Sequence, residues 1–322
     1  MSFESIKALV ANDLREVDRV IRERLGSDVV LVNQVAEYIV GSGGKRLRPL
    51  VVVIGARACG YTGIRHSEAA AIIEFIHTAT LLHDDVVDGS TMRRGRDTAN
   101  EVWGNEASVL VGDYVYSRSF EMMVSLGSMK IMDVMASATN KIAEGEVLQL
   151  MNAHDPETTE ERYFEVIYRK TAKLFESGMQ IAAILSGAPD EVQSKMASYG
   201  RHLGTAFQLI DDVLDYQSNQ EQLGKNLGDD LAEGKPTLPL IYALRHGTSE
   251  QQAVIRSAIE QGSIEQLPQI TAAIESTGGL AYTARLARRE VSLAVEALAA
   301  LPDSAYKQAL RELADFAVER SH

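Results

Sequence analysis

Residues 67–88 read SEAAAIIEFIHTATLLHDDVVD, an apolar helical run that ends on three carboxylates, Asp84, Asp85 and Asp88. Positions i and i+4 of a helix lie one turn apart on the same face, and i+1 lies beside i+4 at i+3 spacing. Three like charges there repel one another, and the helix C-terminus that carries them is already partly negative. An arrangement so unfavourable for stability indicates a bound cation, and carboxylate oxygens are ligands that Mg²⁺ prefers.

The same acidic pattern recurs in residues 207–215, FQLIDDVLD, where Asp211, Asp212 and Asp215 take the same relative positions. A single copy would equally fit a solvated helix face. The flanks are apolar in both copies: Leu81, Leu82, Val86 and Val87 in the first, and Phe207, Leu209, Ile210 and Leu214 in the second. We therefore expect buried flanks and carboxylates that line an interior cleft, where uncompensated charge would cost too much. Two such arcs could hold one phosphorylated substrate between them.

Composition and periodicity favour an all-α protein. The 322 residues include only 7 prolines, and long stretches rich in Ala, Leu, Glu and Gln repeat with helical period. No linker or composition break appears, so we expect one domain over residues 1–322. Helices are expected at 3–25, 49–59, 67–88, 106–125, 129–151, 158–186 and 190–216, and a further helix is expected to follow the first and to end at about residue 40. Ser67 is expected to cap the helix 67–88. Polar loops are expected at 89–105 and 224–236.

Charge and cysteine content exclude some classes of protein. A net charge of −13 argues against nucleic acid as a partner. The single cysteine, Cys59, excludes an intrachain disulfide and fits a reducing compartment. No signal peptide is recognisable, and no apolar run approaches the ~20 residues that span a bilayer. We expect a cytoplasmic protein without a transmembrane segment.

Basic residues gather at two places. Residues 43–49, GGKRLRP, form a glycine-rich turn that opens a helix, with Pro49 near its start. Backbone N–H groups at a helix N-terminus, together with cationic side chains, favour an anion. Arg93 and Arg94 follow the first acidic motif closely, and adjacent guanidinium groups can each bind a phosphate bidentately. A solvated basic turn is the alternative for residues 43–49.

Further polar residues lie at helical spacing from these motifs. His77 lies two turns before the first motif and shares its face, and Gln208 lies one turn before the middle aspartate of the second. Lys170 and Thr171 fall within a predicted helix. Each signal is weak alone, because a buried Lys, Thr and Gln could satisfy one another. His83 points away from the acidic face and is expected to be structural.

Taken together, these motifs resemble the trans-prenyltransferases, or E-polyprenyl diphosphate synthases, over nearly the whole chain. The landmarks occur in the family's order: GGKRLRP at 43–49, DDVVD at 84–88, RRG at 93–95, KT at 170–171, FQLIDDVLD at 207–215 and GKNLGDDLAEGKPTLP at 224–239. No landmark residue departs from the family pattern. The resemblance implies an isoprenoid-synthase type of helical bundle around a deep central apolar cavity, a homodimer, and a bacterial subtype with a C40, octaprenyl, product.

The resemblance also implies a role for each motif. Isopentenyl diphosphate would be added to an allylic diphosphate, farnesyl diphosphate for instance, with about three Mg²⁺ ions bound to the allylic diphosphate. The metal ligands would be Asp84, Asp85, Asp88, Asp211, Asp212 and Asp215. Isopentenyl diphosphate would be held by Lys45, Arg48, His77 and Arg94. The allylic diphosphate would be held by Arg93, Lys170, Thr171, Gln208, Lys225 and Lys235. Thr171, Gln208 and the backbone near Lys170 would also stabilise the allylic cation through oxygen dipoles.

Small residues before the first motif bear on product length. Ala79 and Thr80 lie about one turn before Asp84, where short-chain members of the family tend to carry aromatic residues, so the growing tail can pass. An isoprene unit spans ~5 Å, about one helical turn, so seven units need roughly 35 Å, or ~23 helical residues. The floor of the pocket is then expected near the far end of the 67–88 helix, with Met123 and Met135 as candidates.

Three alternatives remain open. The same chemistry could give a C45–C50 product. A metal-dependent phosphohydrolase would need further histidines at ligand spacing, and only 7 are present, scattered along the chain. A non-catalytic regulatory subunit of a heteromeric prenyltransferase would be expected to lack aspartates or basic loop residues, and none is missing here. A quinone side chain is the fate that the resemblance implies for the product.

Overall fold

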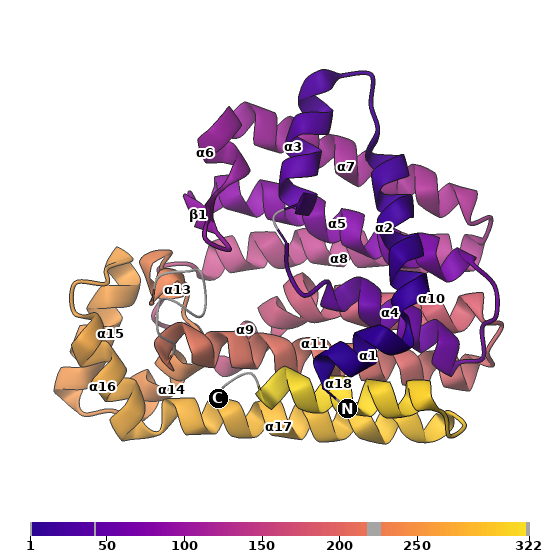
Figure 1. Ribbon diagram of the computed structural model, residues 1–322. Coiled ribbons are helices and arrows are strands. Elements are labelled where there is room, and N and C mark those ends of the chain that lie inside the picture. The colour runs from indigo at the N-terminus through magenta and orange to yellow at the C-terminus, as the bar shows by residue number, and fades with distance from the viewer. Residues whose placement is uncertain (1, 42, 218–226, 320–322) are drawn as a thin grey trace. The chain divides into compact units, whose positions relative to one another are not determined.

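The computed structural model describes residues 2–41, 43–217 and 227–319, and these are almost entirely helical (Figure 1). The all-α class is therefore confirmed. Within the described residues the only strands are β1 (Met92–Arg93) and β2 (Arg96–Asp97), which pair antiparallel with Met92 opposite Asp97.

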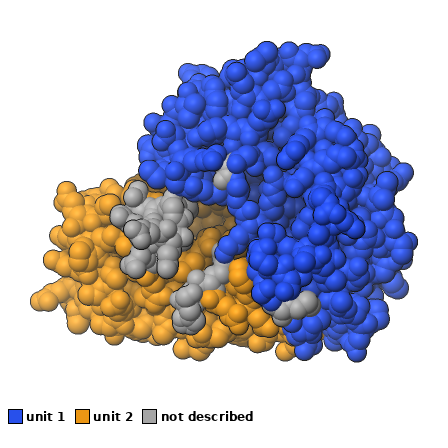
Figure 2. Space-filling view, viewed as in Figure 1, with its two compact units in different colours: residues 1–139, 174–200, 297–313 blue, residues 140–173, 201–296, 314–322 orange. Residues whose placement is uncertain are grey.

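The chain divides into two compact units, which Figure 2 colours blue and orange. Unit 1 comprises residues 1–139, 174–200 and 297–313, and unit 2 comprises residues 140–173, 201–296 and 314–322. Each unit contains residues from distant parts of the sequence. The expectation of a single domain over residues 1–322 stays a prediction.

Unit 1 is organised around one long buried helix. Its helices are α1 (Phe3–Leu9), α2 (Ala11–Leu25), α3 (Val30–Gly41), α4 (Leu47–Ala58), α5 (Arg65–Val87), α6 (Ala99–Trp103), α7 (Asn105–Ser125) and the 3₁₀ turn η2 (Leu298–Ala300). Helix α5 packs along α7 and also contacts α2 and α4. Its buried residues lie all round the axis, as in a helix enclosed by others. The first acidic motif is thus fixed at the end of a fully packed element.

The sequence placed several boundaries in unit 1 incorrectly. Helix α5 begins at Arg65, with Ile64 as its N-cap residue and no side-chain cap, so Ser67 is not the cap. The expected helix 3–25 is interrupted at Val10. The expected loop 89–105 contains the β1–β2 hairpin and α6, because short elements of two to five residues carry no periodic signal.

Unit 2 contains α9 (Glu160–Ile167), a π-helical segment η1 (Tyr168–Ala172), α13 (Asp229–Ala232), α14 (Leu238–His246), α15 (Ser249–Gln261) and α16 (Leu267–Thr277). Five helices contribute residues to both units: α8 (Met129–Asn152), α10 (Lys173–Leu185), α11 (Asp190–Gln217), α17 (Gly279–Ala297) and α18 (Ala305–Glu319). The expected helix 158–186 is therefore not one α-helix, since η1 separates α9 from α10. The expected loop 224–236 contains α13.

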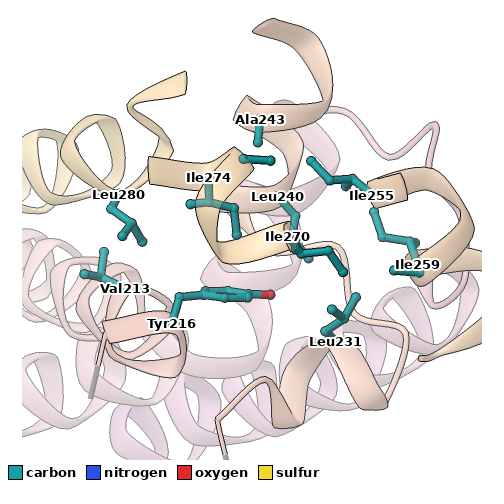
Figure 3. Close-up of a cluster of buried hydrophobic side chains, with 12 residues drawn as sticks. Val213, Tyr216, Leu231, Leu240, Ala243, Ile255, Ile259, Ile270, Ile274 and Leu280 are labelled. Atoms are coloured by element: carbon teal, nitrogen blue, oxygen red, sulfur yellow. The ribbon is translucent and has the colours of Figure 1, made fainter. Parts of the chain in front are cut away.

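An apolar cluster of unit 2 fixes the end of α11. It joins side chains from α11, α13, α14, α15, α16 and α17, including Val213, Tyr216, Leu231, Leu240 and Ile274 (Figure 3). These side chains hold the last turns of α11, which carry the second acidic motif, against α13 and α14. In the described part of the chain, no helix is both long and apolar enough to span a membrane.

Candidate functional site

The first acidic motif lies where α5 ends, and its three aspartates differ in surroundings. Asp85 is 0% exposed, whereas Asp84 and Asp88 are half-buried. Arg93 donates hydrogen bonds from Nε (2.9 Å) and Nη2 (2.6 Å) to Oδ1 of Asp85. No group among the described residues bonds the other oxygen, Asp85 Oδ2. Val87 is 69% exposed, so the expectation that this flanking residue is buried was wrong.

The electrostatics of this motif fit a bound cation. Burial raises the pKa of Asp85, and the carboxylates of Asp84 and Asp88 act in the same direction, against Arg93. The described residues contain no group of three or more His, Cys, Asp or Glu that could hold a metal by itself. Mg²⁺, however, commonly takes one or two carboxylates together with waters and substrate phosphates. An orphaned buried oxygen beside two further carboxylates therefore suits Mg²⁺ bound with a diphosphate.

The side chain of Arg94 contacts the glycine-rich turn before α4, at the glycines that precede Lys45. Gly44 has a φ of +117°, a backbone conformation that favours glycine, and the guanidinium of Arg94 occupies the space where a Cβ would lie. Arg94 Nη1 donates to the carbonyl oxygen of Gly43. Lys45 is exposed. Two of the predicted isopentenyl diphosphate residues, Lys45 and Arg94, thus lie at one turn.

The other two, Arg48 and His77, are in direct contact. Arg48 Nη1 donates to Nε2 of His77 at 3.0 Å, and its guanidinium lies over the ring of Phe175, 4.7 Å from the centroid. Because a guanidinium can only donate, Nε2 of His77 accepts and any ring proton sits on Nδ1. Burial, assisted by Arg48, holds the pKa of His77 well below its usual value. His77 is therefore neutral near pH 7 and would bind a ligand by hydrogen bonding.

Glu74, one turn before His77 on α5, belongs to the same group, although sequence analysis did not single it out. Burial raises its pKa, and Arg46, Arg48 and Arg94 oppose that effect. A carboxylate among three arginines can orient their guanidinium groups. The i, i+3 spacing from His77 was the one signal that could have found it.

The second acidic motif lies on α11, where its middle aspartate is enclosed by donors. Asp212 is 1% exposed and accepts hydrogen bonds from Tyr163 Oη (2.5 Å) and Gln208 Nε2 (2.8 Å). Thr171 Oγ1 donates to Gln208 Oε1 at 3.0 Å. Burial raises the pKa of Asp212, and the nearby Asp230 adds to this effect. The structure thus brings together three predicted site residues and adds Tyr163, which was missed.

The outer aspartates of this motif, Asp211 and Asp215, lie on the same stretch of α11. Asp211 is half-buried and Asp215 is buried. Tyr216, the next residue, anchors this end of α11 in the apolar cluster of Figure 3. The metal-ligand role expected for all six aspartates stays a prediction.

The π-helical segment η1 carries Lys170 and lies very close to α8. A Cβ on Gly145 would lie 2.7 Å from the backbone nitrogen of Lys170, so only glycine allows this approach. Lys170 Nζ donates to Glu146 Oε2 at 2.6 Å. With its carboxamide oxygen turned toward the ammonium groups, Gln149 accepts from Lys170 Nζ (3.2 Å) and Lys235 Nζ (3.3 Å). Two lysines predicted to bind the allylic diphosphate therefore converge on one amide. Single-turn π-helical segments are frequent at functional sites.

Other predicted residues can be placed with less detail. Lys235 also pairs with Glu233. Lys225 lies outside the described residues. Glu146 and Gln149, one turn apart on α8, were not foreseen, because nothing in a single helical sequence shows which distant lysines its polar face will meet.

The residues proposed to set product length all lie in unit 1. Ala79, Met123 and Met135 are buried. Thr80 is half-buried, and its hydroxyl donates to the carbonyl oxygen of His77 at 2.8 Å. Their role in product length stays a prediction.

Comparison with known proteins gives matches over most or all of the chain. The Polyprenyl synthetase family matches residues 29–275. The octaprenyl diphosphate synthase of Escherichia coli (strain K12) is 56% identical over 321 residues, which are 99% of each chain. The all-trans-nonaprenyl-diphosphate synthase (geranyl-diphosphate specific) of Rhodobacter capsulatus is 47% identical over 98% of each chain.

A solved structure is also closely similar. It is a polyprenyl synthase from Caulobacter crescentus CB15, complexed with calcium and isoprenyl diphosphate. Its TM-score is 0.96 at 43% sequence identity, covering 100% of this chain and 98% of the other.

Proposed function

We propose, since the chain belongs to the polyprenyl synthetase family, that it adds isopentenyl diphosphate to an allylic diphosphate such as farnesyl diphosphate to make all-trans-octaprenyl diphosphate. The observation that carries this proposal is the pair of acidic motifs, in each of which a buried aspartate, Asp85 or Asp212, accepts hydrogen bonds from side-chain donors. The Escherichia coli relative, which is 56% identical over its full length and is named an octaprenyl diphosphate synthase, supports the C40 product.

The difficult step is ionisation of the allylic diphosphate, which separates an anion from a carbocation. Bound Mg²⁺ would stabilise the charge that develops on the leaving diphosphate. Asp84, Asp85, Asp88, Asp211, Asp212 and Asp215 are the proposed ligands. The cationic side chains of Arg93, Lys170, Lys225 and Lys235 would add fixed positive charge for the same anion.

The convergence of Lys170 and Lys235 on Gln149 supports their shared role. One neutral amide oxygen, that of Gln149, accepts from both ammonium groups and so brings the two side chains together. Glu146 and Glu233 compensate them within the protein. An arriving diphosphate offers oxygen acceptors of higher charge and would compete with these carboxylates for the same protons.

The second substrate, isopentenyl diphosphate, must bind without ionising. Lys45, Arg48, His77 and Arg94 are proposed to hold its diphosphate through side chains alone. Arg48 and Arg94 supply charge, and neutral His77 supplies a hydrogen bond without adding a further cation. Glu74 would keep the guanidinium groups oriented when the site is empty of substrate.

The experiment that tests this function is a chain-elongation assay. Purified protein is incubated with radiolabelled isopentenyl diphosphate, farnesyl diphosphate and Mg²⁺, and the products are resolved by length. A dominant C40 product is expected. A C45 or C50 product would keep the chemistry and change the length, as the name of the Rhodobacter capsulatus relative allows. No polyprenyl product from folded protein would instead favour the regulatory-subunit or phosphohydrolase alternative.

A homodimer is proposed as the working form. Unit 1 exposes apolar side chains on three helices that contact one another, α3, α6 and α7: Val30, Leu31, Val102, Val109 and Leu110. Large apolar side chains exposed on neighbouring helices favour association. Leu110→Asp is expected to give monomers in light scattering, and an unchanged mass would contradict this interface. Use of the product in quinone synthesis and a cytoplasmic location stay predictions.

A further inference from the structure

Four side chains of unit 2 form one hydrogen-bonded chain, and its first member, Tyr163, belongs to none of the sequence motifs. Tyr163 donates to Oδ2 of Asp212 (2.5 Å), and Gln208 donates from Nε2 to Oδ1 of the same carboxylate (2.8 Å). Thr171 donates from Oγ1 to Oε1 of Gln208 (3.0 Å). Both oxygens of Asp212 are thus engaged by protein donors.

The chemistry of these groups gives the chain one direction. A carboxylate can only accept, so the amide of Gln208 must turn its NH₂ group toward Asp212 and its oxygen toward Thr171. The hydroxyl of Thr171 has a single proton, and the bond to Gln208 uses it. Toward a ligand, the Thr171 oxygen can therefore offer lone pairs but no proton.

The ring of Tyr163 is packed among apolar and aromatic side chains. Its ring is 5% exposed and belongs to an apolar cluster with Leu209, Ile210 and Ile241, drawn from α11 and α14. It also meets Phe164 edge-on, with centroids 5.4 Å apart. The phenol hydroxyl is thus a fixed point from which Asp212, and through it Gln208, takes its orientation.

We propose that Tyr163 is a positioning residue for the reaction. Through Asp212 and Gln208 it holds Thr171 with the negative end of the hydroxyl dipole available to the allylic cation. This inference rests on the proposed function and deepens it, because it names which group orients the dipole. Without the bond from Tyr163, the Asp212 carboxylate could rotate away from Gln208, and the amide would lose the acceptor that fixes the direction of its bond to Thr171.

The test replaces Tyr163 with Phe, which keeps the ring and removes only the hydroxyl. Loss of one buried hydrogen bond to a carboxylate is expected to lower kcat by about ten- to a hundredfold. The KM for isopentenyl diphosphate should stay within about twofold of wild type, since its proposed ligands lie in unit 1. The matched control is Tyr282→Phe, which removes a 2.8 Å bond to Glu160 in the same unit and should leave kcat unchanged.

A double-mutant cycle with Thr171→Val shows whether Tyr163 acts through Thr171. If it does, adding Tyr163→Phe to Thr171→Val lowers kcat far less than in wild type, because both changes remove the same effect. Additive losses would overturn the proposal. So would a Tyr163→Phe enzyme with wild-type kcat per folded molecule, whatever its melting temperature. Absence of polyprenyl synthesis by the wild type would instead overturn the proposed function, and this inference with it.

Discussion

Gly145→Ala sets two effects of opposite sign against each other. Alanine in the interior of a helix is more favourable than glycine by about 1 kcal/mol, so α8 alone should gain stability. The added Cβ, however, would lie 2.7 Å from Lys170 N and 2.8 Å from Arg169 Cβ. Neither atom is at the end of a flexible side chain, so the overpacking should lie near the upper end of its usual range, about 3 kcal/mol. We expect a net destabilisation of ~2 kcal/mol.

The larger effect should be on catalysis. Relief of the clash must move η1, which carries Lys170 and Thr171, and a displacement of about 1 Å at a reacting centre can cost about a hundredfold in rate. The assays are thermal unfolding followed by circular dichroism and steady-state elongation with farnesyl diphosphate. The control is Gly41→Ala at the end of α3, where a Cβ meets nothing within 4 Å and φ is not positive. A Gly145→Ala enzyme with raised melting temperature and wild-type kcat would refute the reasoning.

Three further predictions concern the two acidic motifs, the length of the product and stability in acid. Asp84→Ala and Asp211→Ala should each lower kcat by orders of magnitude with unchanged circular dichroism; normal turnover, or a loss that follows unfolding, would count against the assignment. Ala79→Phe should shorten the products resolved by chromatography, and an unchanged length would show that this face does not meet the growing chain. Burial lowers the pKa of His66 and His77 in the folded protein. Below about pH 6.5 these two residues therefore bind more protons in the unfolded chain than in the folded protein. This effect lowers stability as pH drops from about 7 to 5, whereas the raised pKa of the buried carboxyls Glu74, Asp85 and Asp212 acts in the opposite direction. The melting temperature of His66→Asn should therefore fall less, or rise more, than that of wild type over this range; an identical pH dependence of the melting temperature would contradict the role of His66.

Features that depend on local sequence patterns, namely the helices and the short charged motifs, could be predicted from the sequence. Most helices were located within a few residues, because periodicity extends over many turns and glycines mark several ends. The two acidic motifs, the glycine-rich turn at 43–49 and the arginine pair at 93–94 were recognisable because each lies within nine residues or fewer. The prediction that Ser67 caps its helix was wrong. Serine is suited to capping, but Ser67 lies two positions inside a helix whose N-cap residue is Ile64. A long packed helix gains little from a capping bond, so tertiary packing set the boundary.

Side-chain contacts between segments far apart in the sequence could not be predicted. The bond from Tyr163 to Asp212 and the meeting of two lysines at Gln149 each join residues far apart in the sequence. No periodicity records which polar side chain of one helix will face which residue of another. The π-helical segment η1 was not predicted either, because its five residues have the same kinds of side chains as the α-helices on either side.

The wide turn at η1 has a consequence for how this helix can change in length. In a regular α-helix, one inserted residue rotates everything after it by about 100°, which would turn the buried face of α10 toward solvent. A π-helical turn takes up one additional residue locally, and α10 then continues with Leu174, Phe175 and Met179 buried. Deleting Ala172 would remove that allowance and force either Lys170 or the α10 core out of phase. The segment therefore lets Lys170 and Thr171, the residues proposed to contact the allylic substrate, follow a different helical phase from the buried residues of α10.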